Sequence, residues 1–199
     1  MKINSLHSLA GLIMAIPLLL WALTGFVFLT KPGYETAYEQ LAPKLYAIER
    51  EWVVPPSGQW QELRLVRTTL GYHLLARGSD GLANLDPVTL EPASRPSEEA
   101  VFRLIDDATA HNVERYGRAV SLDNGAVTTD TGVTISFDWE TLKLRQQGDD
   151  TRLINTLYKI HYLQWLTGPR VNTALGVLGL VLLLCLTGLG LFSYAKKRG

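Results

Sequence analysis

Two long hydrophobic runs lie at the two ends of the chain, and a polar segment, residues 31–170, lies between them. Residues 6–30 contain no charged side chain apart from the titratable His7, and residues 171–195 contain none. About 20 consecutive apolar residues are enough for a helix to cross the hydrocarbon core of a membrane. The pattern therefore predicts a transmembrane helix over residues 1–30 and a second over residues 169–199.

The polar segment predicts a compact α+β domain over residues 31–150. Alternating or continuous apolar runs favour strands, and one run with helical spacing follows the capping residue Ser97. We expect a short helix over 34–41, a linker over 55–58, a helix over 98–111, and strands near 63–66, 72–75, 119–122, 133–137 and 142–146. Apolar residues recur at helical spacing over 151–166, which predicts an amphipathic interfacial helix in the segment 151–168.

A short repeat lies inside this domain. Residues 85–90 and 137–142 share the pattern apolar-Asp-x-x-Thr-Leu. An Asp at the first position of a turn can accept hydrogen bonds from the backbone two residues further on. Both copies therefore predict hairpin turns, and Asp86 and Asp138 have a structural role in that interpretation.

The distribution of charge predicts the topology. Every Asp and Glu lies between the two hydrophobic runs, whereas Lys2 precedes the first and the basic residues 196–198 follow the second. Once these four tail residues are set aside, 15 Lys and Arg remain against 19 Asp and Glu, and no basic patch suggests nucleic acid. Cytoplasmic flanks carry excess Lys and Arg, so both termini are expected inside a bacterial inner membrane, with the domain in the periplasm. A cleaved signal peptide at residues 1–30 is the alternative.

Four short stretches resemble the PepSY-associated transmembrane helix family. They are Leu6-His7-Ser8-Leu9-Ala10-Gly11, Leu23-Thr24-Gly25, Ile160-His161 and Leu186-Thr187-Gly188, and the strand, helix and Asp turn of the middle segment resemble the PepSY domain. Ser8 stands where a basic residue often follows the first histidine, and Leu90 and Leu142 stand where the usual turn has Gly. The resemblance implies either a relative of siderophore-iron reductases that carry b-type haem between histidines, or a domain that modulates other proteins.

Two of the four histidines are candidate haem ligands, because haem iron in electron-transfer proteins takes two strong axial ligands. His7 begins a stripe of small residues that includes Gly11, Ala15 and Gly25. His161 lies on the expected interfacial helix. The alternatives stay open: His7 is simply close to the membrane surface, and His161 belongs to an aromatic interface belt. His73 and His111 are expected to be structural.

The predicted topology separates His7 and His161. They precede spans that run in opposite directions, so they lie on opposite membrane faces, about 30 Å apart. Each would then need a second histidine from another chain, which a homodimer or a partner subunit would supply. Small and polar residues predict close helix packing at both levels: Gly11, Ala15, Thr24, Gly25, Gly176, Gly179, Thr187 and Gly188.

No hydrolytic motif, phosphate loop or nicotinamide fingerprint is visible in the sequence. The leading hypothesis is a small inner-membrane protein that binds haem b and passes electrons toward a periplasmic acceptor such as ferric iron. It would not be a complete oxidoreductase alone. The alternative is a non-catalytic, membrane-anchored binding, regulatory or accessory subunit of a larger membrane complex.

Overall fold

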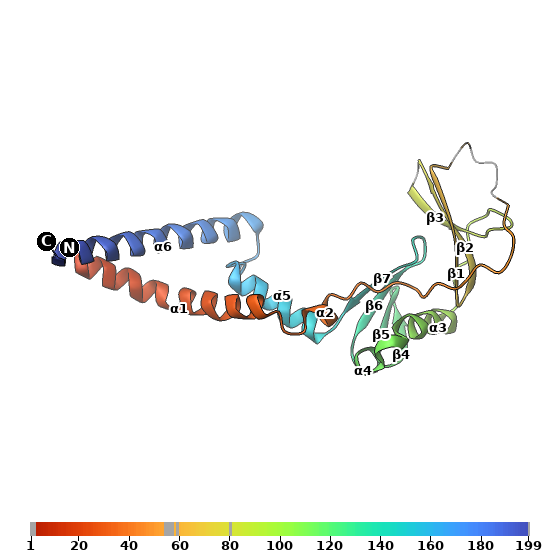
Figure 1. The fold of residues 1–199 in the computed structure, drawn as a ribbon, viewed down its shortest axis with the longest axis horizontal. Coiled ribbons are helices and arrows are strands. Elements are labelled where there is room, and N and C mark those ends of the chain that lie inside the picture. The colour runs from red at the N-terminus through yellow and green to blue at the C-terminus, as the bar shows by residue number, and fades with distance from the viewer. Residues whose placement is uncertain (1–2, 54–57, 59, 80, 199) are drawn as a thin grey trace. The chain divides into compact units, whose positions relative to one another are not determined.

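The protein forms two compact units in a computed structural model that describes residues 3–53, 58, 60–79 and 81–198. One unit holds residues 1–34 and 152–199, and the other holds Glu35–Thr151. Each hydrophobic run forms one long helix, α1 (Ile3–Thr30) and α6 (Pro169–Arg198). The two helices lie side by side and antiparallel (Figure 1). Two apolar helices flanking a central α+β region were the predicted fold, and that prediction is confirmed.

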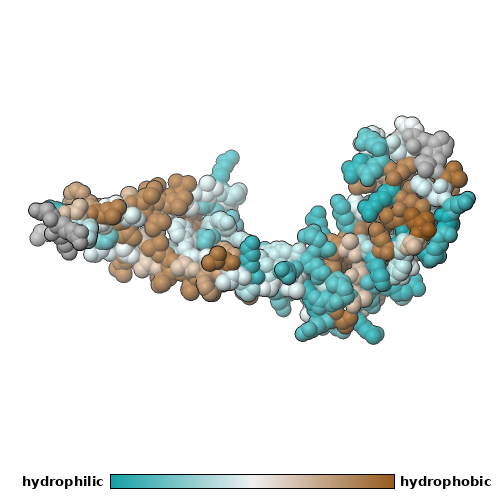
Figure 2. Space-filling view, viewed as in Figure 1, coloured by the Kyte–Doolittle hydropathy of each residue, from teal (hydrophilic) through white to brown (hydrophobic). Residues whose placement is uncertain are grey.

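Large apolar side chains cover the outside of the helix pair (Figure 2). Leu12, Leu29 and Leu184 each expose more than two thirds of their surface, whereas Met14 in the interior exposes 2%. Such contiguous exposed apolar surface is costly in water and suits lipid. Both helices are long and apolar enough to cross a membrane.

The predicted amphipathic helix is α5 (Asp149–His161), and its expected end at residue 166 was wrong. Leu163 has a left-handed backbone with a φ of 54°, which ends the helix. Its side chain is buried, and its Cδ1 atom lies 3.1 Å from where a Cβ would stand on Gly179 of α6. The loop is then held by Asn172, whose side chain bonds both the N–H and the carbonyl of Leu166. The packing of Leu163 against α6 therefore ends α5 earlier than the helical spacing of apolar residues predicts.

The helix expected over 34–41 is shorter, because α2 spans Tyr34–Ala37 only. The carbonyl oxygens of Thr36 and Ala37 accept hydrogen bonds from the Gln146 side chain, and Thr151 Oγ1 also donates to Ala37. Side chains of the domain thus occupy the carbonyls that a continuing helix would use. Of the linker expected over 55–58, only Gly58 lies within the described residues.

Among the described residues of the second unit, seven strands form two antiparallel sheets. The first sheet has the order β1 (Glu62–Thr68), β2 (Gly71–Gly78), β3 (Gly81–Leu85). The second has the order β4 (Ala119–Asp123), β5 (Ala126–Thr129), β6 (Thr134–Asp138), β7 (Lys143–Gln147). The five predicted strands are present, and β3 and β5 were missed.

The main core lies between the second sheet and α3 (Glu98–Thr109), which Ser97 caps by accepting a hydrogen bond from the backbone of Ala100. The helix ends two residues before the predicted position, and η1 (Ala110–Asn112) and α4 (Val113–Tyr116) follow it. Its apolar face packs on one inward-pointing side chain each from β5, β6 and β7. The helix contributes Val101, Ile105 and Ala108, and the strands contribute Val127, Ile135 and Leu144. Burial of this face holds the helix on the sheet.

Trp139, in the turn between β6 and β7, joins the two sheets. Its backbone carbonyl accepts a hydrogen bond from Asn84 of β3, and its indole nitrogen donates to the carbonyl of Ala93. The ring also meets His73 of β2 edge to face, at 5.3 Å between centroids. Asn84 is 1% exposed, and this bond satisfies its buried side-chain nitrogen, whereas its Oδ1 atom has no hydrogen-bond partner.

Candidate functional site

His161 is the last residue of α5, and its ring lies against α1. The Nδ1 atom lies 2.8 Å from Oγ1 of Thr24, and the Cε1 atom lies 3.9 Å from where a Cβ would stand on Gly25. Thr24 is 4% exposed. The structure thus brings together three residues that the sequence had singled out, over a chain separation of 137 residues.

The Thr24 hydroxyl fixes the tautomer of His161. Its proton goes to the backbone carbonyl of Leu20, at 2.6 Å, which leaves the Thr24 oxygen as an acceptor. In the neutral form of His161, Nδ1 then donates to this oxygen and Nε2 carries no proton. Within the described part of the chain, Nε2 makes no hydrogen bond. A neutral imidazole held by a second residue at one nitrogen is the usual arrangement of a metal-ligating histidine.

Aromatic rings hold the His161 ring in position. Phe28 of α1 meets it edge to face at 5.0 Å between ring centroids, and Tyr162, the next residue along the chain, does so at 5.3 Å. Phe28 also stacks on Tyr158, one helical turn before His161, at 4.4 Å. The sequence had suggested an aromatic interface belt around His161 but gave no sign that Phe28, far away along the chain, would join it.

His7 lies at the opposite end of the helix pair and packs on α6. Its Cε1 atom is 3.2 Å from where a Cβ would stand on Gly190. The Nδ1 atom is buried and has no hydrogen-bond partner. Only a glycine leaves room for the ring here. Gly190 is therefore the glycine that faces His7, and the sequence had emphasised Gly188.

His7 and His161 do not meet. Thr24, the partner of His161, lies 17 residues after His7 on α1, which corresponds to about 25 Å along the helix. Among the described residues, no three His, Cys, Asp or Glu side chains form a cluster that could hold a metal ion. A metal ion bound by either histidine would therefore need further ligands from a second chain or from a bound molecule.

The residues predicted for close helix packing fall into two groups. Gly11 of α1 faces Leu186 of α6 across the helix pair. Gly25 faces His161 at the end of α5, and Gly179 faces Leu163 in the loop that follows α5. Gly176 and Gly188 have open space where a Cβ would stand, and Ala15, Thr187 and Gly188 are exposed. These residues therefore do not pack against the other helix of the same chain, and close packing at them would need another chain.

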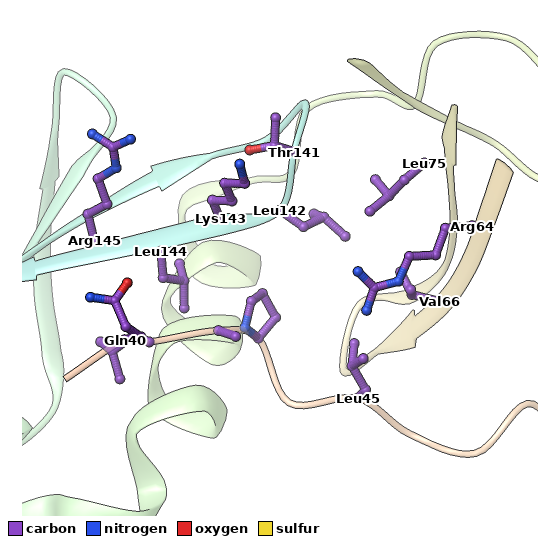
Figure 3. A pocket seen from close by; sticks show the side chains of 13 residues that line it. Gln40, Leu45, Arg64, Val66, Leu75, Thr141, Leu142, Lys143, Leu144 and Arg145 are labelled. Atoms are coloured by element: carbon purple, nitrogen blue, oxygen red, sulfur yellow. The ribbon is translucent and has the colours of Figure 1, made fainter. Parts of the chain in front are cut away.

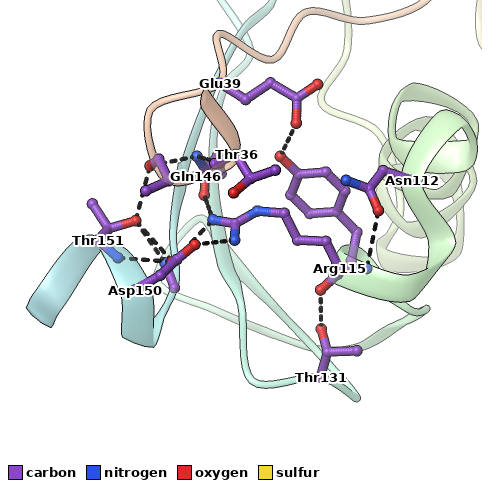
Figure 4. Close-up of polar contacts among 11 residues, drawn as sticks. Thr36, Glu39, Asn112, Arg115, Thr131, Gln146, Asp150 and Thr151 are labelled. Atoms are coloured by element: carbon purple, nitrogen blue, oxygen red, sulfur yellow. Dashed lines mark hydrogen bonds and ion pairs between the residues drawn. The ribbon is translucent and has the colours of Figure 1, made fainter. Parts of the chain in front are cut away.

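A polar network ties the first and last residues of the α+β unit together (Figure 4). Arg115 of α4 forms an ion pair with Asp150 and donates to the Gln146 side chain, 2.7 Å away. Glu39 accepts a hydrogen bond from Tyr116 at 2.6 Å and lies 2.6 Å from Nε2 of His111. The chain enters and leaves this unit through one hydrogen-bonded junction.

The ionisation of this network follows from its contacts. Burial, together with the hydrogen bond to Glu39, raises the pKa of Tyr116 to about 12. Burial also acts to raise the pKa of Glu39, but the hydrogen bonds from Tyr116 and His111 outweigh it, and that pKa is lowered. Near neutral pH, Glu39 is therefore a carboxylate and Tyr116 a neutral donor. This charge distribution suits a structural junction and shows no group poised for acid–base catalysis.

The other two histidines have structural partners. His73 is 4% exposed, its Nε2 atom lies 3.0 Å from Oγ1 of Thr68, and burial lowers its pKa. His111 contacts the carbonyl of Ala108 through Nδ1 and Glu39 through Nε2. Both were expected to be structural, and these contacts agree with that expectation.

Comparison with known proteins identifies the class of protein. Residues 2–197 match the model of the PepSY-associated TM region, so the chain belongs to this family of membrane proteins. No curated protein and no solved structure matches the chain. The family match covers both apolar helices and the domain between them, which agrees with the resemblance seen in the sequence.

Proposed function

We propose that this membrane protein binds b-type haem through His161 and His7 and passes electrons across the bacterial inner membrane toward a periplasmic acceptor. The observation that carries the proposal is the hydrogen bond between Thr24 and His161, because it leaves Nε2 of a neutral imidazole free to bind iron. The site would be completed by a histidine of a second copy or of a partner subunit, since each histidine stands alone at its end of the helix pair.

The chain's own residues have distinct roles in this proposal. Thr24 holds the His161 ring and its tautomer, and Phe28 and Tyr162 fix the plane of that ring. His7 binds through Nε2. Its buried Nδ1 has no hydrogen-bond partner, whereas Nδ1 of His161 is bonded to Thr24. When bound, haem supplies a one-electron iron couple whose potential depends on these surroundings. The basic tails support cytoplasmic termini, which puts the domain and His161 on the periplasmic side.

The spectrum of the purified chain tests the proposal. Chain expressed in a haem-replete host should show a reducible low-spin b-type spectrum, because two imidazoles give a strong axial field. His161→Ala should remove the part due to one haem, and Thr24→Val should shift its midpoint potential while retaining the haem. Thr30→Val is the matched control, since Thr30 also donates to a helix carbonyl, that of Phe26, but does not contact His161.

Two results together would contradict haem binding. A folded chain that stays colourless when haem is added, and whose Thr24→Val variant behaves as Thr30→Val does, would contradict haem binding. The alternative would then be a non-catalytic accessory subunit, in which two helices anchor a binding domain. One observation favours that role independently: the α+β unit contains an open groove of about 450 Å³, with β7 on one side and β1 on the other (Figure 3).

A further inference from the structure

An apolar pocket of about 160 Å³ lies in the helix pair, where α1, α6 and the loop that follows α5 meet. Residues of all three segments line it, among them Met14, Pro17 and Trp21 of α1, Leu163 and Trp165 of the loop, and Gly179 of α6. A dry protein cavity of about 150 Å³ with apolar walls can hold one benzene ring. The pocket is thus large enough for a single six-membered ring.

The pocket opens toward the lipid. Met14 and Leu163 are buried in its wall, with exposed fractions of 2% and 7%. Ile13, Trp165 and Leu178 also line it, and each of them exposes more than half of its surface. A molecule would therefore enter this pocket from the hydrocarbon core and not from water, which requires an occupant that is soluble in lipid.

Trp21 brings a hydrogen-bond donor without a partner to the pocket. Its Nε1 atom is buried and unpaired, whereas the indole of Trp165 donates to the carbonyl of Ile160 at 3.3 Å. An indole nitrogen can donate a hydrogen bond but cannot accept one. Other buried polar atoms of the described chain also lack a partner, among them Nε1 of Trp52 in the α+β unit. The unpaired nitrogen alone therefore indicates no ligand, and its depth in the membrane is the second observation.

The depth of Trp21 restricts what can pair with its N–H. Trp21 lies about 4 Å along the helix from the middle of the 24-residue span His7–Thr30. Neither water nor the ester groups of lipids reach this depth, because the hydrocarbon core is about 30 Å thick. An unpaired donor costs more free energy there than beside water. The acceptor must therefore belong to an apolar molecule that carries it into the hydrocarbon core.

We propose that this pocket binds the ring of a membrane quinone. A quinone ring is flat and apolar, and its carbonyl oxygens accept hydrogen bonds without donating any, which complements the indole of Trp21. One carbonyl oxygen would accept the N–H of Trp21, and the ring would lie against Met14 and Leu163, while the apolar tail would stay in the lipid. The inference does not depend on haem binding, because neither His7 nor His161 lines the pocket.

The full chain in zwitterionic lipid nanodiscs tests this assignment through its five tryptophan indoles. The probes are duroquinone and durene, which has the same tetramethylated ring but no carbonyl group. In proton–nitrogen NMR spectra, duroquinone should shift the Trp21 indole proton downfield until saturation, because a new hydrogen bond forms, and durene should leave it in place. Trp52 is the matched control, since its Nε1 is also buried and unpaired but belongs to the other unit, and its signal should not move.

A substitution measures how much this N–H contributes to binding. The affinity is followed through the methyl signal of Met14, which lies in the pocket wall and is retained in every variant. Trp21→Phe keeps an apolar ring but removes the donor, so it should weaken duroquinone binding about five-fold. Trp52→Phe should leave the affinity unchanged. The remaining indole signals report whether each variant is folded.

Three results would each overturn the proposal. The first is a Trp21 proton that moves as far with durene as with duroquinone, which would leave an apolar cavity without a preference for a carbonyl group. The second is a Met14 signal that changes with duroquinone without reaching saturation. The third is equal affinity of the native chain and Trp21→Phe for duroquinone. A folded chain that binds no haem can still pass all three tests, so this proposal and haem binding fail separately.

Discussion

Leu90 and Leu142 occupy the same position in the two Asp turns and share a left-handed backbone, with φ values of 61° and 51°. In each turn, the Asp side chain accepts hydrogen bonds from the backbone N–H groups of the residues two and three positions further on. This confirms the structural role predicted for Asp86 and Asp138. The turn then needs a positive φ, which costs a non-glycine residue about 1–2 kcal/mol. A glycine at this position would avoid that cost.

The two leucines should respond differently to replacement by Gly. Leu90 is 37% exposed, so Leu90→Gly should raise the free energy of unfolding by about 0.5–1 kcal/mol through relief of backbone strain. Leu142 is 7% exposed and lines the groove, so Leu142→Gly should lower it by about 1–3 kcal/mol because burial is lost. Chemical denaturation of the two variants checks the pair. Equal effects would show that burial does not distinguish the turns.

The two candidate histidines also differ at this scale, although the sequence treated them alike. His161 has a hydroxyl that fixes its tautomer, and His7 has a buried nitrogen without a partner. The sequence contained the residues for the first contact, since Thr24 and His161 were both singled out. It could not show the second, because the packing of His7 on Gly190 depends on the offset between two helices, and Leu-rich sequences fix that offset weakly.

At the scale of the elements, Gly179 sets how closely α6 approaches its neighbours. Leu163 reaches within 3.1 Å of its missing Cβ, and Trp21 of α1 within 3.7 Å. Gly179→Val should therefore push the helices apart and lower the free energy of unfolding by about 1–3 kcal/mol. Gly176→Val is the matched control, because nothing lies within 4 Å of its Cβ position. Thermal unfolding in detergent measures both, and comparable losses would contradict the observed packing.

The elements differ in how well the sequence predicts them. The apolar runs of α1 and α6 and the capped periodic run of α3 carry strong local signals, and these helices were predicted. Strand β3 contains Gly81 and a buried Asn84, which lower its local strand preference, and the partner of Asn84 is 55 residues away. The end of α5 is likewise set by the burial of Leu163 against α6. Local pattern therefore predicts elements, and tertiary contacts decide their ends and the weak strands.

At the scale of the whole molecule, the α+β unit keeps its two ends together. Thr36 and Ala37, near its beginning, are bonded by Gln146 and Thr151, near its end. The ion pair of Arg115 with Asp150 reinforces the same junction. A domain inserted between two adjacent transmembrane helices must have neighbouring ends. The sequence could not indicate this junction, because its partners are more than a hundred residues apart.

Topology is the whole-molecule property that the functional proposal needs most, and it can be measured by cysteine labelling. We expect the α+β unit in the periplasm, because the basic residues Lys2, Lys196, Lys197 and Arg198 flank the spans and long loops cross largely regardless of their charge. In a Cys185→Ser background, a cysteine at the exposed Ser121 should react with an impermeant maleimide in cells with a permeabilised outer membrane. A cysteine at Lys196 should react only after lysis.

The reverse labelling would place His161 on the cytoplasmic side and His7 on the periplasmic side, and would reverse the direction of any electron transfer. Labelling of both positions in intact cells would contradict a two-span topology, because the uncharged apolar stretch 171–195 lies between Ser121 and Lys196 in the sequence. Replacing Lys196, Lys197 and Arg198 with Gln should increase the share of inverted chains, since the excess of Lys and Arg sets orientation. If these replacements leave the labelling unchanged, the charge of the C-terminal tail does not determine the topology, and Lys2 or the folding of the domain must do so.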